Sequence, residues 1–136
     1  MARSLKANDT EVYTFTNNNP LQYRSGDCVI RAISLAFNKD WYEVYDDLYR
    51  LGREMADMPN VNRVYETYIT KLGGKKISAY RELEGGRKRI TARDLTKRNG
   101  TFIISTAKHL AVVKNKKLLD TWDSSDRSAY KIWEIA

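Results

Sequence analysis

The chain of 136 residues contains few of the residue types that build cross-links and metal sites. It has one cysteine and one histidine, so it can form no internal disulfide, and a zinc site would have to use carboxylate ligands. It has no run of about twenty apolar residues, the length that a membrane span needs. These absences argue against a disulfide-stapled domain, a structural metal centre and a membrane partner.

Two further features concern location and partners. The segment MARSLKANDTEVYTF lacks the apolar stretch of a signal peptide, so we expect a cytoplasmic protein, of a bacterium or a phage-infected cell. The net charge of +7 suits an acidic partner, and nucleic acid is one candidate. Much of that charge lies in GRKRITARDLTKR, residues 86–98, which we interpret as a solvated helix with its leading loop. The oligomeric state is not determined by these features.

The length and an apolar content of 42% suit a single domain over residues 1–136, with residues 1–20 as an extended lead-in. Within the lead-in, the segment VYTF is suited to an edge strand. Helical spacing of apolar residues predicts four helices, the last of them short, over residues 28–37, 40–55, 61–72 and 91–98. Capping boxes are predicted where the second and fourth helices begin, at Asp40 with Glu43 and at Thr91 with Asp94.

The last third of the chain has a different pattern of residues. Its apolar segments are short, rich in β-branched and aromatic residues, and separated by turn-like pieces: TFIIST, HLAVVKN, KKLLDTWD and YKIWEI. They predict an antiparallel sheet. Helices followed by strands indicate an α+β fold in which an N-terminal helical layer packs on a C-terminal antiparallel β-sheet. In the second helix, Trp41, Tyr45 and Tyr49 are interpreted first as packing residues and second as a peptide-binding wall.

The single cysteine, Cys28, lies where the first helix is expected to begin. A thiol at a helix N-terminus faces the positive end of the helix dipole and unpaired N–H groups, which stabilise thiolate. His109 begins a predicted strand and could move a proton between the thiol and a leaving group. Asp120 follows across a predicted hairpin and could orient the imidazole. Taken singly, each residue has a structural alternative; taken together, they have the three roles of a cysteine-hydrolase triad.

Two charged residues lie beside the cysteine. Asp27 is interpreted as the N-cap of the first helix, with a carboxylate that raises the pKa of the thiol as the alternative. Arg31 follows Cys28 by about one helical turn, so it could lower the pKa of the thiol or pair with Asp27. The sequence does not separate these possibilities.

The stretch QYRSGDC resembles the Gln-x-x-x-Gly-x-Cys pattern of papain-like cysteine peptidases in the broad sense, which include the bacterial double-glycine-leader peptidases. KHLAVV is similar to the strand that begins at the histidine of this family, and DTWD is similar to its Asn-Ser-Trp motif. Aspartate in place of asparagine matches the leader-peptidase branch. The resemblance implies a papain-like fold and cysteine peptidase activity on a protein or peptide, with no metal or organic cofactor.

The resemblance also implies a role for each matching residue. Cys28 is the nucleophile, His109 the general base and acid, and Asp120 the residue that orients the histidine. The amide of Gln22 joins the backbone N–H of Cys28 in an oxyanion hole, with Gly26 as a supporting residue of the motif. Trp122 shields the hydrogen bond between the histidine and its acid. Two departures from the pattern are Val29, where papain-type enzymes carry an aromatic residue, and the short chain.

Other functions fit the same residues. GDCVIRAIS resembles the cysteine motif of ovarian-tumour-type deubiquitinases, with a different Asp-Gly order, and the Asp-Cys pair with His-x-Ala-Val resembles peptidoglycan amidases of the NlpC/P60 and CHAP types. A different class of function is a catalytically silent papain-like module that uses its basic surface to bind an acidic protein or nucleic acid. We expect the enzyme first and the binding module second.

Overall fold

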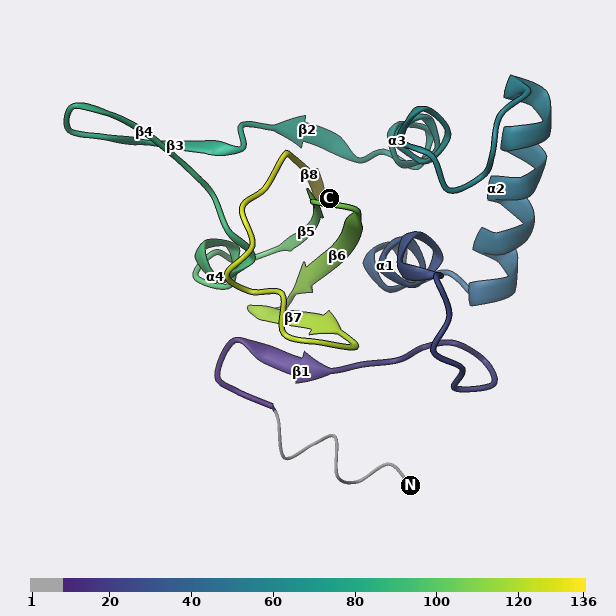
Figure 1. Cartoon of the computed structure of the whole chain (residues 1–136), viewed down its shortest axis with the longest axis horizontal. Helices are drawn as coiled ribbons and strands as arrows, with labels where there is room; N and C mark the ends of the chain where they lie inside the picture. Colours follow the sequence, from purple (N-terminus) through teal and green to yellow (C-terminus); the bar gives the residue numbers. More distant parts are fainter. Residues whose placement is uncertain (1–8) are drawn as a thin grey trace.

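The computed structural model describes residues 9–136 and has a mixed α+β fold (Figure 1). Residues 1–8, part of the expected lead-in, lie outside the described residues. The helices are α1 (Cys28–Phe37), α2 (Trp41–Met55), α3 (Asn62–Lys71) and the short α4 (Ala92–Leu95). They lie where the sequence predicted helices, although α4 is shorter than expected. Within residues 9–136, no helix has the length and apolar character needed to cross a membrane.

Six strands form one sheet in the order β1-β7-β6-β5-β8-β2. They are β1 (Tyr13–Phe15), β2 (Lys75–Ile77), β5 (Thr101–Thr106), β6 (His109–Lys114), β7 (Lys117–Asp120) and β8 (Lys131–Ile135). All neighbouring strands are antiparallel except β1 and β7, which run parallel. The predicted C-terminal strands and the predicted edge strand are thus confirmed. β2, at the other edge, was not predicted from its three-residue segment KKI.

Both faces of this sheet are buried. Successive side chains of a strand point to opposite faces, and in β5 Ile103 belongs to one buried cluster whereas Phe102 and Ile104 belong to another. The first cluster contains side chains of α1, α2 and α3, and the second contains Leu95 of α4. Figure 1 shows the three longer helices on one side of the sheet and α4 on the other. Burial on two faces explains why β5 and β6 are apolar without strict alternation.

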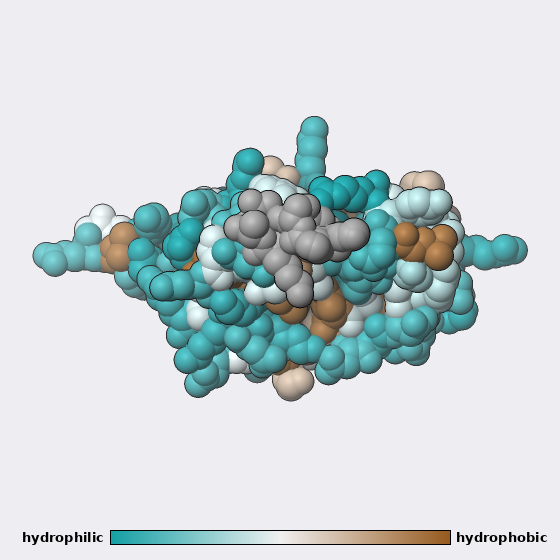
Figure 2. Space-filling view, turned by 90° about the horizontal axis from the view of Figure 1, so that it is seen from below, coloured by the Kyte–Doolittle hydropathy of each residue, from teal (hydrophilic) through white to brown (hydrophobic). Residues whose placement is uncertain are grey.

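Residues 86–98, expected to form a helix with its leading loop, begin with a strand instead. β4 (Gly86–Arg89) pairs with β3 (Tyr80–Leu83) in a two-stranded hairpin that projects from one end of the molecule (Figures 1 and 2). Gly85 in its turn has a φ of +85°, a conformation that glycine adopts without strain. Neither strand shows an apolar alternation, because most of the hairpin is exposed. The periodicity on which strand prediction depends is therefore missing here.

The helix caps agree with the sequence in part. Thr91 and Asp94 form the predicted capping box at α4. At α2, Asp40 caps the helix by accepting from the backbone N–H of Tyr42, whereas the Glu43 carboxylate accepts from Lys39 at 2.9 Å. The second box is therefore only half formed, because a lysine one turn earlier takes the carboxylate that would have completed it.

Gly52 allows the chain after α2 to lie against this helix. The backbone N–H of Asp57 donates to the Gly52 carbonyl at 2.9 Å. A Cβ at position 52 would lie 2.8 Å from the Asp57 carbonyl oxygen and 3.3 Å from the Cα of Pro59. The segment that packs closely against Gly52 continues to Asn60, which lines the groove described below.

Gly52→Ala is expected to lower the free energy of unfolding by about 1–3 kcal/mol, because overpacking against backbone outweighs the better helix propensity of alanine. The shift in the urea midpoint measures this loss. The matched control is Gly86→Ala, where a Cβ meets nothing within 4 Å. The control is expected to change the free energy of unfolding by no more than about 0.5 kcal/mol. Equal midpoints for the two variants would contradict the argument.

Candidate active site

Cys28 is the first residue of α1, as predicted, and its half-buried side chain lines a groove of about 450 Å³. The groove lies between the helical layer and the sheet. The helical layer contributes Gly26, Cys28, Val29, Asn60, Asn62 and Tyr65, and the sheet side contributes Ser105, Thr106, Lys108, His109, Leu110 and Tyr130. The helix start thus brings the only thiol of the chain to the end of β6 that carries the only histidine.

His109 begins β6, directly after the tight turn from β5, in which Lys108 has a φ of +53°. Its Nε2 atom lies 2.6 Å from Oδ2 of Asp120, at the end of β7. β6 and β7 pair with Val112 opposite Leu119, so the same register continued places residue 122 opposite residue 109. The hairpin therefore delivers the histidine, its acid and a tryptophan together, as the sequence predicted for this segment.

Trp122 packs on the histidine. The centroids of the His109 and Trp122 rings are 4.9 Å apart with their planes inclined by 47°. The guanidinium of Arg127 lies over the indole, 5.4 Å from the ring centroid. Trp122 remains 40% exposed, so it covers the imidazole while it faces solvent itself. This arrangement suits the shielding role that the resemblance implies for it.

Asp120 is almost completely buried, with 1% of its surface exposed. Besides the His109 ring, its carboxylate accepts from the backbone N–H of Thr121 at 2.7 Å and from the hydroxyl of Ser124 at 3.1 Å. The guanidinium of Arg31 lies 3.4 Å from Oδ1. A buried carboxylate without partners would be costly, but this one has four polar contacts. They hold it in place against the imidazole.

The pKa of the Cys28 thiol is lowered, and that of the His109 imidazole is raised. Burial acts to raise the pKa of Cys28, but hydrogen bonds with His109 and with the backbone N–H of Leu110, and the charges of His109 and Arg31, bring it below its ordinary value. Burial acts to lower the pKa of His109, whereas the hydrogen bonds and charges of Asp120 and Cys28 raise it to about 9. Both shifts favour the thiolate–imidazolium form of the pair.

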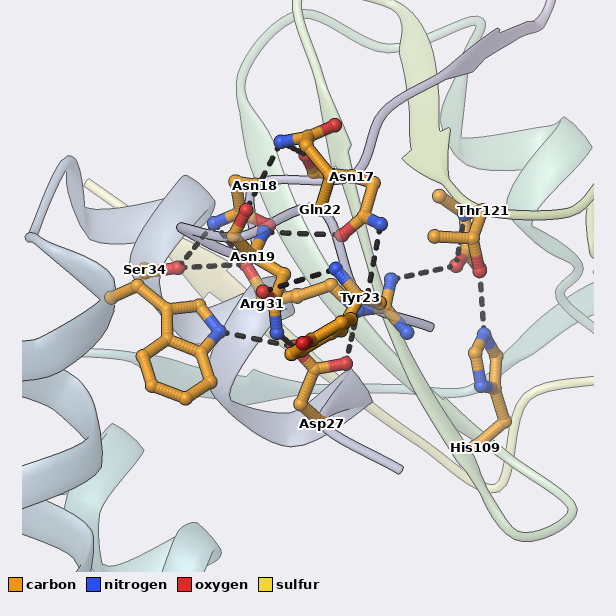
Figure 3. Close-up of polar contacts among 12 residues, drawn as sticks. Asn17, Asn18, Asn19, Gln22, Tyr23, Asp27, Arg31, Ser34, His109 and Thr121 are labelled. Atoms are coloured by element: carbon orange, nitrogen blue, oxygen red, sulfur yellow. Dashed lines mark hydrogen bonds and ion pairs between the residues drawn. The ribbon is translucent and has the colours of Figure 1, made fainter. Parts of the chain in front are cut away.

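Arg31 connects this site to the helical layer (Figure 3). Its Nε donates to Oδ1 of Asp27 at 2.8 Å, while its Nη1 donates to Asp120 at 3.4 Å. The other oxygen of Asp27 accepts from the indole N–H of Trp41 at 3.0 Å and from the amide of Asn19 at 3.1 Å. A chain of contacts thus runs from the second helix through two buried carboxylates to the catalytic histidine candidate.

The interpretation of Asp27 as the N-cap of α1 is only partly confirmed. The residue occupies the N-cap position of α1, but its side chain makes no capping hydrogen bond. Its carboxylate turns instead to Arg31, Asn19 and Trp41, because these three donors surround it in the interior. Those hydrogen bonds and the charge of Arg31 overcome the effect of burial and lower the pKa of Asp27. Of the two roles left open for Arg31, the structure has both: it pairs with Asp27 and lowers the pKa of the thiol.

Gln22 is not brought into the groove. Its side-chain amide donates to the carbonyls of Asn17 and Asn19, both at 3.0 Å, within the asparagine cluster seen in Figure 3. Its two N–H groups are thereby occupied, so this arrangement does not support the oxyanion role that the resemblance implies. The backbone N–H of Cys28 has no acceptor among the described residues, as is normal for the first turn of a helix. This N–H can therefore donate to a group bound at the thiol.

Gly26 lines the groove two residues before the thiol, and a Cβ there would meet no atom within 4 Å. Its φ is not positive, so glycine is not needed for the backbone. Two side chains that sequence reasoning did not single out also belong to the site, Asn60 in the groove and Ser124 on Asp120. Nothing in their local sequence marks them, because each reaches the site through a loop.

Comparison with known proteins gives no relative: no family model, no curated protein and no solved structure matches this chain. Residues 9–136 contain no group of three or more His, Cys, Asp or Glu side chains that could hold a metal ion. The chemistry of the site is therefore argued from the arrangement of its own side chains.

Arg31→Met is expected to lower the free energy of unfolding by about 3–5 kcal/mol at neutral pH, because two buried carboxylates lose their cation. The deficit should shrink on acidification, since the stabilisation tied to the lowered pKa of Asp27 is present above its unfolded pKa and is lost as the pH falls through its folded pKa. Urea unfolding of both proteins at neutral and acidic pH measures this. The control is Arg50→Met, which breaks an exposed pair with Asp47 and should cost at most about 1 kcal/mol. Equal losses would contradict the role of Arg31.

The single imidazole of the chain is expected to titrate at a pKa of about 9 in nitrogen-detected NMR spectra, and the signal needs no assignment. Cys28→Ala should lower this pKa, because it removes the hydrogen bond and the charge of the thiolate. Asp120→Asn should lower it as well, by removing the carboxylate charge. An imidazole that titrates near its ordinary value of about 6.5 in the unmodified protein would contradict the ion-pair description.

Proposed function

We propose that the chain is a cysteine hydrolase that cleaves an amide bond, and that its α+β fold is of the papain-like kind. The observation that carries the proposal is that Cys28 and His109 line one groove, with an Asp120–His109 separation of 2.6 Å and a thiol pKa that His109 helps to hold below its ordinary value. A structural cysteine has no need of an imidazole that a buried carboxylate orients. Cysteine nucleophiles need such an imidazole.

The proposed reaction needs no group other than these side chains and water. The Cys28 thiolate attacks the amide carbonyl carbon, and the C–N bond breaks as the His109 imidazolium gives its proton to the leaving amine. The acyl group is then held as a thioester. Neutral His109 next takes a proton from water, whose oxygen attacks the thioester carbonyl. The C–S bond breaks, the carboxylic product leaves, and thiolate and imidazolium are regenerated.

In this proposal the two ring nitrogens of His109 have different tasks. Nε2 is engaged by the Asp120 carboxylate, so Nδ1 is the nitrogen left for the thiol and for the leaving group. An acid that fixes one nitrogen selects the tautomer and the orientation of the other. For the oxyanion, the backbone N–H of Cys28 at the start of α1 is the proposed donor. Its position at a helix N-terminus adds the favourable end of the helix dipole.

The scissile bond belongs to a protein or peptide in this proposal. The groove of about 450 Å³ is open to solvent along the boundary of two layers, which suits an extended chain. An isopeptide bond or a peptidoglycan amide would undergo the same chemistry, so those substrates are the alternatives within the hydrolase class.

The test is the rate of Cys28 alkylation by iodoacetamide as a function of pH. The unmodified protein is expected to react with an apparent pKa well below the free-thiol value of about 8.5. In His109→Ala the inflection should move up toward that value, because the hydrogen bond and charge that stabilise thiolate are gone. Cys28 is the only cysteine, so the mass of the intact protein reports the reaction at one site.

Slow alkylation with an ordinary inflection that His109→Ala does not change would overturn the proposal. It would favour the catalytically silent binding module instead. One observation indicates where such a module would bind an acidic partner. Arg81 and Lys88 lie opposite each other in the projecting hairpin of β3 and β4. Like charges directly opposite each other destabilise a strand pair, and an acidic partner would relieve the repulsion.

A further inference from the structure

The projecting hairpin of β3 and β4 carries positive charge that the fold does not neutralise. Within residues 9–136, four of its cations form no ion pair: Arg81, Arg87, Lys88 and Arg89. Cations nearby are paired, since Lys131 of β8 contacts Glu66 at 2.7 Å and Arg93 of α4 contacts Asp126 at 3.0 Å. The charge of the hairpin is therefore available to an acidic partner.

The two faces of the hairpin are built differently. Cross-strand partners share a face and successive residues alternate, so Arg87 and Arg89 lie on the same face as Tyr80. Arg81 and Lys88 lie on the opposite face. The guanidinium carbons of Arg87 and Arg89 lie 4.2 Å and 4.9 Å from the centroid of the Tyr80 ring. One face thus holds two guanidinium groups against an aromatic ring.

An acidic residue shares this face without neutralising it. Glu82 lies opposite Arg87 in the strand register, but the guanidinium of Arg87 lies over the Tyr80 ring and makes no ion pair with an acid of residues 9–136. A guanidinium over a ring can still donate from its edge to a carboxylate, in bidentate geometry. Arg87 is exposed, so its edge is accessible to a partner.

The arginine face continues to the groove that holds the thiol. Nη1 of Arg89 donates to the carbonyl of Ala129 at 2.7 Å, and its guanidinium lies 5.6 Å from the centroid of the Tyr130 ring. Tyr130 is 56% exposed and lines the groove, and its backbone N–H donates to the carbonyl of Ser105, another groove residue, at 2.7 Å. We name these four side chains the arginine–tyrosine row, in order from the hairpin to the groove: Arg87, Tyr80, Arg89 and Tyr130.

The position of His109 determines which part of a substrate meets the row. In the proposed reaction the imidazolium gives its proton to the leaving amine, so the residues after the scissile bond lie on the histidine side of the thiol. Tyr130 and Lys108 line the groove on that side together with His109. Lys108 is exposed, and no acid of residues 9–136 pairs with it. The leaving portion therefore runs along positive charge toward the row.

The chemistry of this surface suits carboxylates of a polypeptide. The free edge of Arg87 and the ammonium of Lys108 are donors that match acidic side chains. Single-stranded nucleic acid binds by stacking its bases on aromatic rings, but the Tyr80 ring already carries two guanidinium groups. Continuity with a groove that is proposed to cleave a polypeptide also favours a polypeptide as the occupant.

We infer that the arginine–tyrosine row binds an acidic segment of the polypeptide substrate, rich in Asp or Glu, on the leaving-group side of the bond that is cleaved. This inference rests on the proposed function and adds a substrate preference to it. The surface differs from that of the catalytically silent module, for which Arg81 and Lys88 on the opposite face were considered. Attraction of this kind would increase the rate of substrate encounter and set the direction in which the chain lies.

The experiment compares two peptides with an iodoacetyl group at the N-terminus, followed by two glycines and then by six Glu or six Gln. The thiol of Cys28 reacts at the methylene carbon, so the peptide extends from it in the chain direction of residues after a scissile bond. Eight extended residues reach roughly 26 Å. Each alkylation rate is divided by that of iodoacetamide. At low ionic strength the Glu peptide is expected to react about tenfold faster than the Gln peptide, and added salt should reduce this ratio.

Two neighbouring residues separate binding at the row from general attraction to a basic protein. Arg87→Gln removes one cation of the row and should lower the ratio of Glu to Gln rates about threefold. Lys88→Gln is the matched control, because it removes one exposed cation from the opposite face of the same strand. It should change the ratio by less than about 1.5-fold. Circular dichroism checks that both variants are folded.

Three results would overturn the inference. The first is equal rates for the Glu and Gln peptides in the unmodified protein, and the second is an equal loss of the ratio in Arg87→Gln and Lys88→Gln. The third concerns nucleic acid as the occupant: fluorescent oligothymidylate would bind more tightly than a fluorescent Glu peptide without the iodoacetyl group, and Arg87→Gln would weaken it.

The proposed function and the row can fail separately. Iodoacetyl peptides alkylate a thiol of ordinary reactivity slowly, so the ratio of Glu to Gln rates is measurable whether or not His109 activates Cys28. The pH profile with iodoacetamide therefore tests the proposed function, and the ratio of peptide rates tests the row.

Discussion

The guanidinium of Arg31 between two buried carboxylates is the interaction on which the rest of the site depends. It joins Asp27, at the start of the helical layer, to Asp120, at the end of a sheet strand. Neither acid could remain charged in the interior without a cation and further donors. The pairing therefore fixes the position of α1 relative to the sheet. The thiol of Cys28 and the ring of His109 meet because those two elements are held together at this point.

The same interaction determines the electrostatics of the proposed chemistry. A single cation cannot fully neutralise two carboxylates, and the excess negative charge near Asp120 favours a protonated His109. The imidazolium in turn favours thiolate at Cys28, which the N-terminus of α1 also stabilises. The polar network extends in the other direction to Trp41, so the second helix and His109 share one set of polar contacts.

The sheet contributes by burying both of its faces. Helices α1 to α3 cover one face and α4 lies on the other, so strands β5, β6 and β7 are enclosed by packing. A strand enclosed in this way has little conformational freedom, so the residues at its ends are held in fixed positions. His109 at one end of β6 and Asp120 at one end of β7 are thereby positioned by the core, and Trp122 closes over the imidazole from the chain that follows. The candidate site residues thus lie at element ends, where backbone order and solvent access coincide.

The sequence alone determined what depends on near neighbours: the four helices, the C-terminal strands, and the order of Cys28, His109 and Asp120 along them, because apolar periodicity and turn chemistry are local. It failed for the exposed hairpin of β3 and β4, which has no apolar face and hence no period. Only the tertiary structure decided the hydrogen-bond partners of two side chains. Asp27 makes no capping hydrogen bond, and the amide of Gln22 donates to nearby carbonyls. The physical reason is that a polar side chain takes whichever donors and acceptors the folded chain brings within reach, and apolar periodicity carries no information on how the loop before α1 folds.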